Sequence, residues 1–231
     1  MNDAPLVRWL SEAAGTALLV GIGTGTIVAS ARVGGISLGL MAVAWSAAVL
    51  LPILLFIRVS GAHLNPAVTL ALAGSGRIAW REVPPYVASQ LGGAFLGSGL
   101  VWAVLGRGDH LGATLPAHGD LIPVIVGEMT FSALLVGAVF LLSDQGEGRR
   151  RWRLLLPTVA VGLSTYVIGP FTGSSLNPAR SIAPAVLSGT YTDLWAYLLV
   201  VPTTALALAL VWRPRSVDRL DRGPGRLDSS R

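Results

Sequence analysis

Two short motifs place an asparagine side chain at the start of a helix. The sequence Asn65-Pro66-Ala67 is repeated as Asn177-Pro178-Ala179. Asparagine is a favoured N-cap and proline is favoured at the first helical position, so each motif predicts a helix that begins at the proline. The amide of such a side chain also carries two N–H donors. The chemistry expected at both motifs is therefore hydrogen bonding to the oxygen of a neutral molecule.

Both predicted helices are too short to cross a bilayer. The first has room between Pro66 and Gly74 and the second between Pro178 and Gly189, which is about 8 to 11 residues or about 12 to 17 Å each. A hydrocarbon core is about 30 Å thick, so two such half-helices placed end to end just cover it. The two asparagine caps are then expected to meet near the middle of the membrane.

The composition is that of a protein that crosses the membrane several times. Of the 231 residues, 52% are hydrophobic, and long apolar runs recur along the chain. The net charge of +5 comes from 17 basic residues, all arginine, which gather in short polar segments beside those runs, so nucleic-acid binding is not expected. We predict an all-α membrane protein with six transmembrane helices, at about 6–29, 36–57, 82–105, 121–143, 153–170 and 191–212.

The arginines also predict an orientation. The segment 143–153 holds three consecutive arginines, so it is assigned to the cytoplasm, which places both chain termini there as well. Residues 1–212 are expected to form one channel-like domain in the cell membrane, and the polar tail 213–231 is expected to be disordered. The chain has no cysteine, and His110 and His118 lack metal-ligand spacing, so neither a metal nor a cofactor is expected.

The chain contains an internal duplication. Glu12 is followed after five residues by Ala-Leu-Leu-Val-Gly, and Glu128 is followed by the same run at the same distance, 116 positions later. The two Asn-Pro-Ala motifs lie 112 positions apart. Each half has three predicted spans, an odd number, so the second half runs upside-down relative to the first. Inverted repeats of this kind place the working site at their interface near the midplane.

These residues together resemble the aquaporin family, also called the major intrinsic proteins. The resemblance covers residues 6–212, with repeat halves at about 6–105 and 121–212, and includes both motifs, Arg180 three residues after Asn177, and the two glutamates. The stretch from Thr172 to Ser181 looks most like nodulin-like intrinsic proteins and their bacterial relatives. The resemblance implies the aquaporin fold, with six transmembrane helices and two re-entrant half-helices, and a homotetramer in the lipid bilayer.

Spacing from each asparagine carries the family's four-residue selectivity constriction onto Trp45, Thr165, Ser174 and Arg180. Strict water channels resemble this set only at Arg180, because they usually have Phe in place of Trp45 and His in place of Thr165. Glycerol facilitators usually carry Asp directly after the arginine, where this chain has Ser181. The constriction is therefore expected to be wider than that of a strict water channel.

The segments before the half-helices are expected to be irregular backbone at membrane depth, which is tolerable where it lines water. Their carbonyl groups should form a row of hydrogen-bond acceptors along a pore. Glu12 and Glu128 are expected to support these segments by accepting backbone N–H bonds, with a proton relay as the alternative. His63 is either a packed loop residue or a gate. The expected carbonyl row comprises Gly61, Ala62, His63, Leu64, Thr172, Gly173 and Ser175.

The predicted function is a passive channel for water and small uncharged solutes such as glycerol, which excludes protons and ions. A mainly water-selective pore and a channel for urea or neutral metalloid hydroxides are the alternatives within this class. An inverted-repeat secondary transporter is the alternative from another class. No Ser/His, paired-Asp or HExxH arrangement suggests an enzyme.

Overall fold

The computed structural model describes residues 4–143 and 154–212, and within these ranges it is helical and contains no strand. The predicted cytoplasmic loop, apart from Ser143, and the predicted tail lie outside the described residues. The elements are α1 (Pro5–Arg32), α2 (Leu38–Phe56), α3 (Pro66–Gly74), η1 (Trp80–Glu82), α4 (Val83–Leu105), η2 (Gly108–Gly112), η3 (Ala117–Gly119), α5 (Leu121–Ser143), α7 (Leu155–Val167), α8 (Gly169–Thr172), α9 (Pro178–Ser188) and α10 (Leu194–Val211).

Five of the helices in the described ranges are long and apolar enough to cross a membrane: α1, α2, α4 together with η1, α5 and α10. The remaining predicted span, 153–170, corresponds to α7, which has 13 described residues and is followed after Ile168 by the short helix α8. The interruption at Ile168 follows from Pro170, because proline has no backbone N–H to continue the hydrogen bonds of α7 and is favoured in the first turn of a new helix. The predicted span of about 153–170 therefore extends past the end of α7 at Val167.

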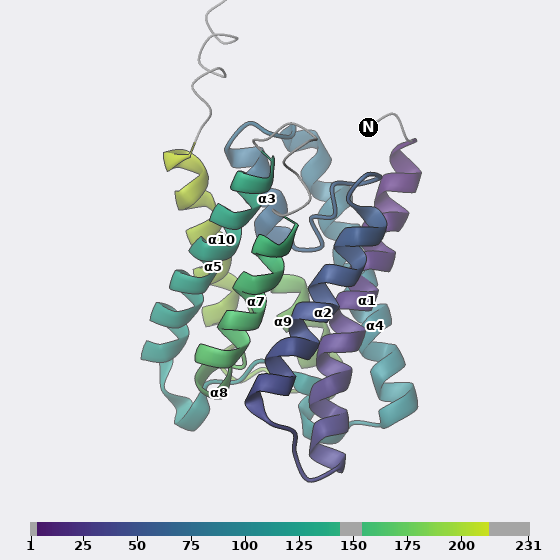
Figure 1. The fold of residues 1–231 in the computed structure, drawn as a ribbon, viewed down its shortest axis with the longest axis vertical. Coiled ribbons are helices and arrows are strands. Elements are labelled where there is room, and N and C mark those ends of the chain that lie inside the picture. Colours follow the sequence, from purple (N-terminus) through teal and green to yellow (C-terminus); the bar gives the residue numbers. More distant parts are fainter. Residues whose placement is uncertain (1–3, 144–153, 213–231) are drawn as a thin grey trace, which may run out of the picture.

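The two half-helices begin as the motifs predict, at Pro66 and Pro178. They end at Gly74 and at Ser188, where Gly189 adopts left-handed backbone (φ 76°) as the residue after the helix. Figure 1 shows the long helices running along the molecule, with α3 in its upper part and α9 below it. Helix α1 begins and α10 ends at the same end of the molecule.

The long helices pack in a repeated arrangement. In the first half α1 packs against α4, in the second α5 packs against α10, and α2 packs against α7 across the two halves. The contact between α1 and α4 depends on glycine: a Cβ at Gly93 would lie 2.1 Å from the carbonyl oxygen of Ala13, and one at Gly97 would lie 2.5 Å from that of Ala17. The glycines therefore allow the backbones of α1 and α4 to pack in direct contact.

Candidate functional site

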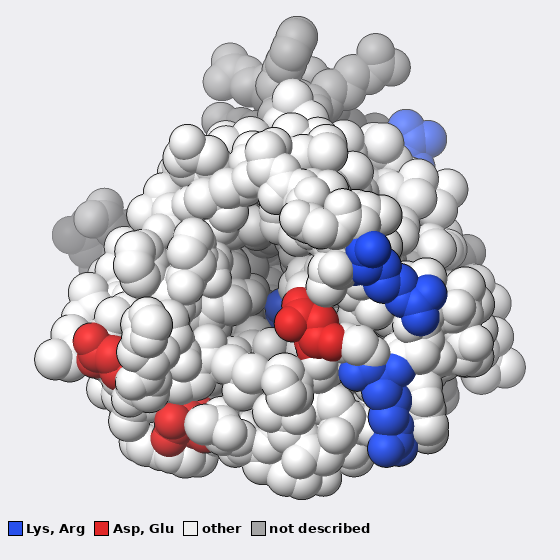
Figure 2. Space-filling model, turned by 90° about the horizontal axis from the view of Figure 1, so that it is seen from below, with Lys and Arg blue, Asp and Glu red and all other residues white. Residues whose placement is uncertain are grey.

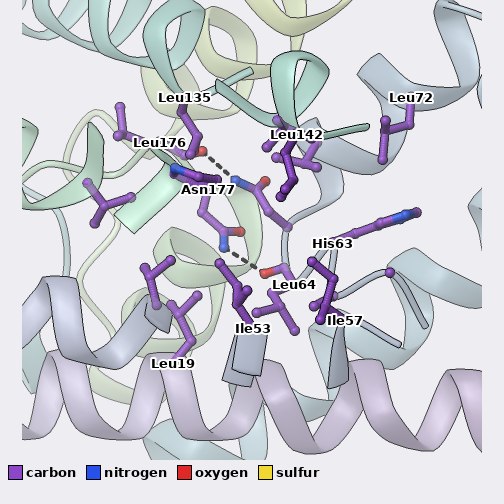
Figure 3. Close-up of a pocket in the computed structure, with 18 of the residues that line it drawn as sticks. Leu19, Ile53, Ile57, His63, Leu64, Leu72, Leu135, Leu142, Leu176 and Asn177 are labelled. Atoms are coloured by element: carbon purple, nitrogen blue, oxygen red, sulfur yellow. Dashed lines mark hydrogen bonds between the residues drawn. The ribbon is translucent and has the colours of Figure 1, made fainter. Parts of the chain in front are cut away.

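The asparagine caps connect the two halves of the protein. Each side-chain oxygen caps its own half-helix, with Asn65 Oδ1 accepting from Ala67 N at 2.9 Å and Asn177 Oδ1 accepting from Ala179 N at 3.0 Å. Each side-chain nitrogen crosses to the other half. Asn65 Nδ2 donates to Leu176 O at 2.7 Å, and Asn177 Nδ2 donates to Leu64 O at 2.9 Å; both bonds are dashed in Figure 3. Since a primary amide has two N–H donors, each asparagine retains one.

The backbone before each cap is unusual and follows the same pattern in both halves. Ala62 and Leu64 have positive φ angles of 49° and 56°, and the corresponding Ser174 and Leu176 have 47° and 53°. Left-handed backbone costs about 1 to 3 kcal/mol for a residue with a side chain, and persists only where surrounding contacts enforce it. Four such residues in two short segments therefore require strong local support.

The two buried glutamates supply that support. Glu12 Oε1 accepts from His63 N at 2.9 Å and from Ser60 Oγ at 2.7 Å, while its Oε2 accepts from Leu64 N at 2.7 Å and from Gln90 Nε2 at 2.8 Å. Both oxygens are thus fully engaged. A backbone held at consecutive N–H groups by one carboxylate cannot relax to ordinary φ values without breaking these bonds.

Glu128 repeats this arrangement in the second half. Its Oε1 accepts from Thr172 Oγ1 at 2.8 Å and from Ser175 N at 2.9 Å, and its Oε2 accepts from Leu176 N at 2.9 Å. Two tyrosines complete the supports, because Tyr86 donates to Ser60 O and Tyr197 donates to Thr172 O. Each re-entrant segment is therefore fastened to its own half by one carboxylate and one phenol.

Removing either carboxylate charge is expected to lower stability. In Glu12→Gln and Glu128→Gln the new amide has one acceptor oxygen, and its NH2 group faces backbone N–H donors. Losing a charge-assisted hydrogen bond costs about 1.5 to 3 kcal/mol. We expect a lower yield of folded protein and a lower thermal aggregation midpoint in detergent.

Asp109→Asn is the matched control for these glutamate variants, because it removes one acidic charge from an exposed residue of η2. This control should keep the yield and midpoint of the parent. Glutamine variants that assemble normally but lose a proton-dependent flux would contradict the supporting role and favour the relay.

Arg180 is a fixed cation in the wall of the site. Its side chain is buried, with Nη1 donating to Gly112 O at 2.7 Å and Nη2 donating to Gly173 O at 3.3 Å. The guanidinium carbon lies 4.7 Å from the centre of the Trp45 ring, within the range of a cation–π contact. Within the described residues Arg180 forms no ion pair. Its charge is therefore held in place by neutral groups and is not neutralised by a carboxylate there.

One cavity of about 430 Å³ contains the caps and most of the predicted site. It extends from Arg77 and Ser143 at the end of the molecule where α5 finishes, past both asparagines, to Trp45 and Arg180. Apolar side chains surround the paired amides in Figure 3, and the His63 ring points away from Asn177. Seen from the opposite end, the molecule has a hollow with charged side chains beside it (Figure 2). The apolar residues labelled around the amides are Leu19, Ile53, Ile57, Leu72, Leu135 and Leu142.

The predicted constriction and carbonyl row lie only partly along this cavity. Trp45, Ser174 and Arg180 line it, whereas Thr165 is buried beside it and donates to Val161 O. Within the carbonyl row, Thr172 and Gly173 do not line the cavity, and their carbonyls accept from Tyr197 and Arg180 respectively. The row residues that line it are Gly61, Ala62, His63, Leu64 and Ser175.

A family model described as "Major intrinsic protein" matches residues 4–212. The chain belongs to the major intrinsic protein family. It is 37% identical over 209 residues to aquaporin NIP1-1 of Zea mays, covering 88% of this chain and 72% of that protein. It is 32% identical over 215 residues to nodulin-26 of Glycine max, covering 90% and 77% respectively.

A solved structure also shares the fold of this major intrinsic protein. The X-ray structure of the aquaglyceroporin from Plasmodium falciparum matches with a TM-score of 0.79 at 23% identity, over 95% of this chain and 100% of that one. The family and its apolar helices make the chain an integral membrane protein with the aquaporin fold. The predicted family and fold class are confirmed.

Several residues that contribute to the site of this major intrinsic protein were not predicted from the sequence. Gly112, the last residue of η2, accepts a hydrogen bond from Arg180, and nothing in the sequence marks its carbonyl. The hydroxyl chain from Thr114 through Ser181 to Ser175 was also missed, with oxygen separations of 3.0 and 2.6 Å. One signal was present: Tyr86 and Tyr197 occupy equivalent places in the last long helix of each half, and each holds the segment before its half-helix.

Proposed function

We propose that the protein is a passive channel that conducts water and small uncharged solutes such as glycerol. The observation that carries this proposal is the pair of asparagine amides in one cavity, at the meeting point of two half-helix N-termini. A solute with oxygen atoms can accept from the remaining amide donors while its carbon backbone passes apolar side chains. The relatives named aquaporin support the same class of function.

The same arrangement opposes ions. Each half-helix N-terminus carries about half a positive charge, and both point to the place where the amides meet. Arg180 adds a full positive charge beside Trp45. Cations and protons therefore meet two successive electrostatic barriers, whereas neutral molecules meet neither.

The residues at the constriction support the passage of solutes as large as glycerol. Ser174 is small, and its hydroxyl lies 2.5 Å from Ser164 Oγ, so it is drawn toward α7. Trp45 supplies a broad apolar wall for a carbon backbone, and Arg180 supplies hydrogen-bond donors for hydroxyl groups. A mainly water-conducting pore is the second candidate, since tryptophan is larger than the phenylalanine of strict water channels. Urea and neutral metalloid hydroxides would use the same donors.

Stopped-flow volume changes of proteoliposomes in gradients of glycerol, urea and a neutral metalloid hydroxide, with water flux measured alongside, test the proposal. A channel should give solute flux that rises linearly with solute concentration. Flux that saturates and depends on an ion gradient would instead support a secondary transporter. The shortage of charged groups in the cavity argues against such ion coupling, because within the described residues Arg77 and Arg180 are the charged side chains that line it, with His63 as the further ionisable group.

Thr165→His is expected to lower glycerol flux by about tenfold while water flux falls less, because a ring at this position is large enough to reach the constriction. Thr165 is adjacent to Ser164, the residue that bonds Ser174. Val159→His is the matched control, since Val159 lies on the same helix with its side chain exposed. A parent impermeable to glycerol would refute the solute assignment, and an unchanged glycerol flux in Thr165→His would refute the place of Thr165 in the constriction.

The proposal includes an orientation and an assembly. Residues 1–212 form the channel domain, and both termini face the cytoplasm, which agrees with α1 beginning and α10 ending at one end of the molecule. We place the protein in the cell membrane as a homotetramer with one pore in each subunit. Glu12 and Glu128 act as supports for the pore segments rather than as a relay, and the protein uses neither a cofactor nor a metal.

A further inference from the structure

We infer that Gly23 of α1 sets the width of the constriction, because its missing side chain leaves the space that the Trp45 indole occupies. This inference rests on the proposed function. Gly23 is buried, and a Cβ built on it would lie 2.5 Å from Cη2 and Cζ3 of Trp45 and 2.8 Å from Cε3. Carbon atoms in ordinary contact are about 3.5 to 4.0 Å apart, so a methyl group here would displace the indole by about 1 Å.

The displaced ring has one open direction. Trp45 packs in an apolar cluster with Leu19, Val20 and Val49, and its ring is in contact with the Arg180 guanidinium. Arg180 cannot follow the ring easily, because Gly112 and Gly173 hold both of its terminal nitrogens. Packed interiors resist compression. The indole is therefore pushed into the cavity that it lines, and the opening for solute becomes narrower.

The internal repeat shows that position 23 is directed at the pathway. Gly23 follows Glu12 at the same distance as Val139 follows Glu128. Val139 lines the cavity with its own side chain. In the first half, the equivalent space is filled from α2 by Trp45. A glycine on α1 and a large aromatic residue on α2 thus form a complementary pair, which allows a tryptophan at the constriction without closing it.

The inference is tested with Gly23→Ala in proteoliposomes, measuring glycerol and water flux in the same preparation. We expect glycerol flux to fall about tenfold and water flux to fall by less than about threefold, because a narrower opening excludes the larger molecule first. Alanine favours helix, so α1 should form normally. Gly25→Ala is the matched control, since its Cβ would meet Val101 Cγ2 at an ordinary 3.4 Å. It should keep the flux ratio of the parent.

A second substitution separates ring displacement from general damage. In Gly23→Ala with Trp45→Phe, the single ring does not reach as far as the second ring of the indole, so the glycerol-to-water ratio should return toward that of Trp45→Phe alone. A parental ratio in Gly23→Ala, or no recovery in the double variant, would overturn the inference. If the parent conducts water but no glycerol, the solute proposal fails, and Gly23 is tested on water flux alone, which must fall in Gly23→Ala and recover with Trp45→Phe.

Discussion

Replacing both caps by aspartate, Asn65→Asp together with Asn177→Asp, is expected to make the channel leak cations. Aspartate is as good an N-cap as asparagine, so both half-helices should still begin at their prolines. The two side chains cross, each reaching the residue before the other, and carboxyl groups this close share a proton. About one negative charge then remains, enough to cancel the two half-charges of the helix ends.

The size of this effect follows from the charge that is cancelled. We expect the K⁺ conductance of the double aspartate variant in planar bilayers to rise at least about 100-fold, which corresponds to about 2.8 kcal/mol of barrier. Water flux should fall, since the amide donors and the two hydrogen bonds to Leu64 O and Leu176 O are lost. The single aspartate variants should show smaller leaks.

Asn65→Ser with Asn177→Ser is the matched control for the aspartate pair. Serine also caps helices well, but it is neutral, and its side chain is too short to reach Leu64 O or Leu176 O in the other half. If the serine pair leaks as much as the aspartate pair, cations are excluded by the hydrogen bonds that the asparagines make to Leu64 O and Leu176 O, and not by the charge at the helix ends. A double aspartate variant that stays impermeable to K⁺ would contradict a barrier located at the asparagines.

The fold was largely predictable because its strongest signals are local. An Asn-Pro pair specifies a helix start without help from the rest of the chain, and Pro66 and Pro178 begin α3 and α9 as expected. Hydrophobic length located the spans in the same way. The break after Val167 was missed because the apolar run continues through it, although Gly169-Pro170 carried the signal.

The site was less predictable because its geometry depends on contacts between distant segments. The roles of Leu64 and Leu176 could not be read from the sequence, since their carbonyls accept from asparagines more than 100 residues away. Thr165 was placed by its spacing from Asn177, and Gly173 as part of the segment before the half-helix; neither argument says which side of the backbone faces a cavity. The space at Gly23 is likewise a property of the packed structure, and one glycine among 28 gave no sign of it.

Loss of the Arg180 charge is the other substitution with a large expected effect. Arg180→Met keeps a long apolar side chain against Trp45 but removes the cation and both bonds to Gly112 and Gly173. A unit charge acts on an ion about 4 Å away with about 4 kcal/mol where the effective dielectric constant is about 20. We therefore expect K⁺ and proton leaks in proteoliposomes to rise by about two to three orders of magnitude.

Arg180→Lys separates the charge from the geometry. Lysine keeps one positive charge, but its compact ammonium group does not reproduce the planar fork that reaches two carbonyls. It should therefore still exclude cations while the ratio of glycerol to water flux changes. If Arg180→Lys leaks like Arg180→Met, the anchoring of the loop at Gly112 matters more than the charge. If Arg180→Met excludes K⁺ as the parent does while still conducting water, the half-helix ends alone form the barrier, and Arg180 serves only to select among neutral solutes.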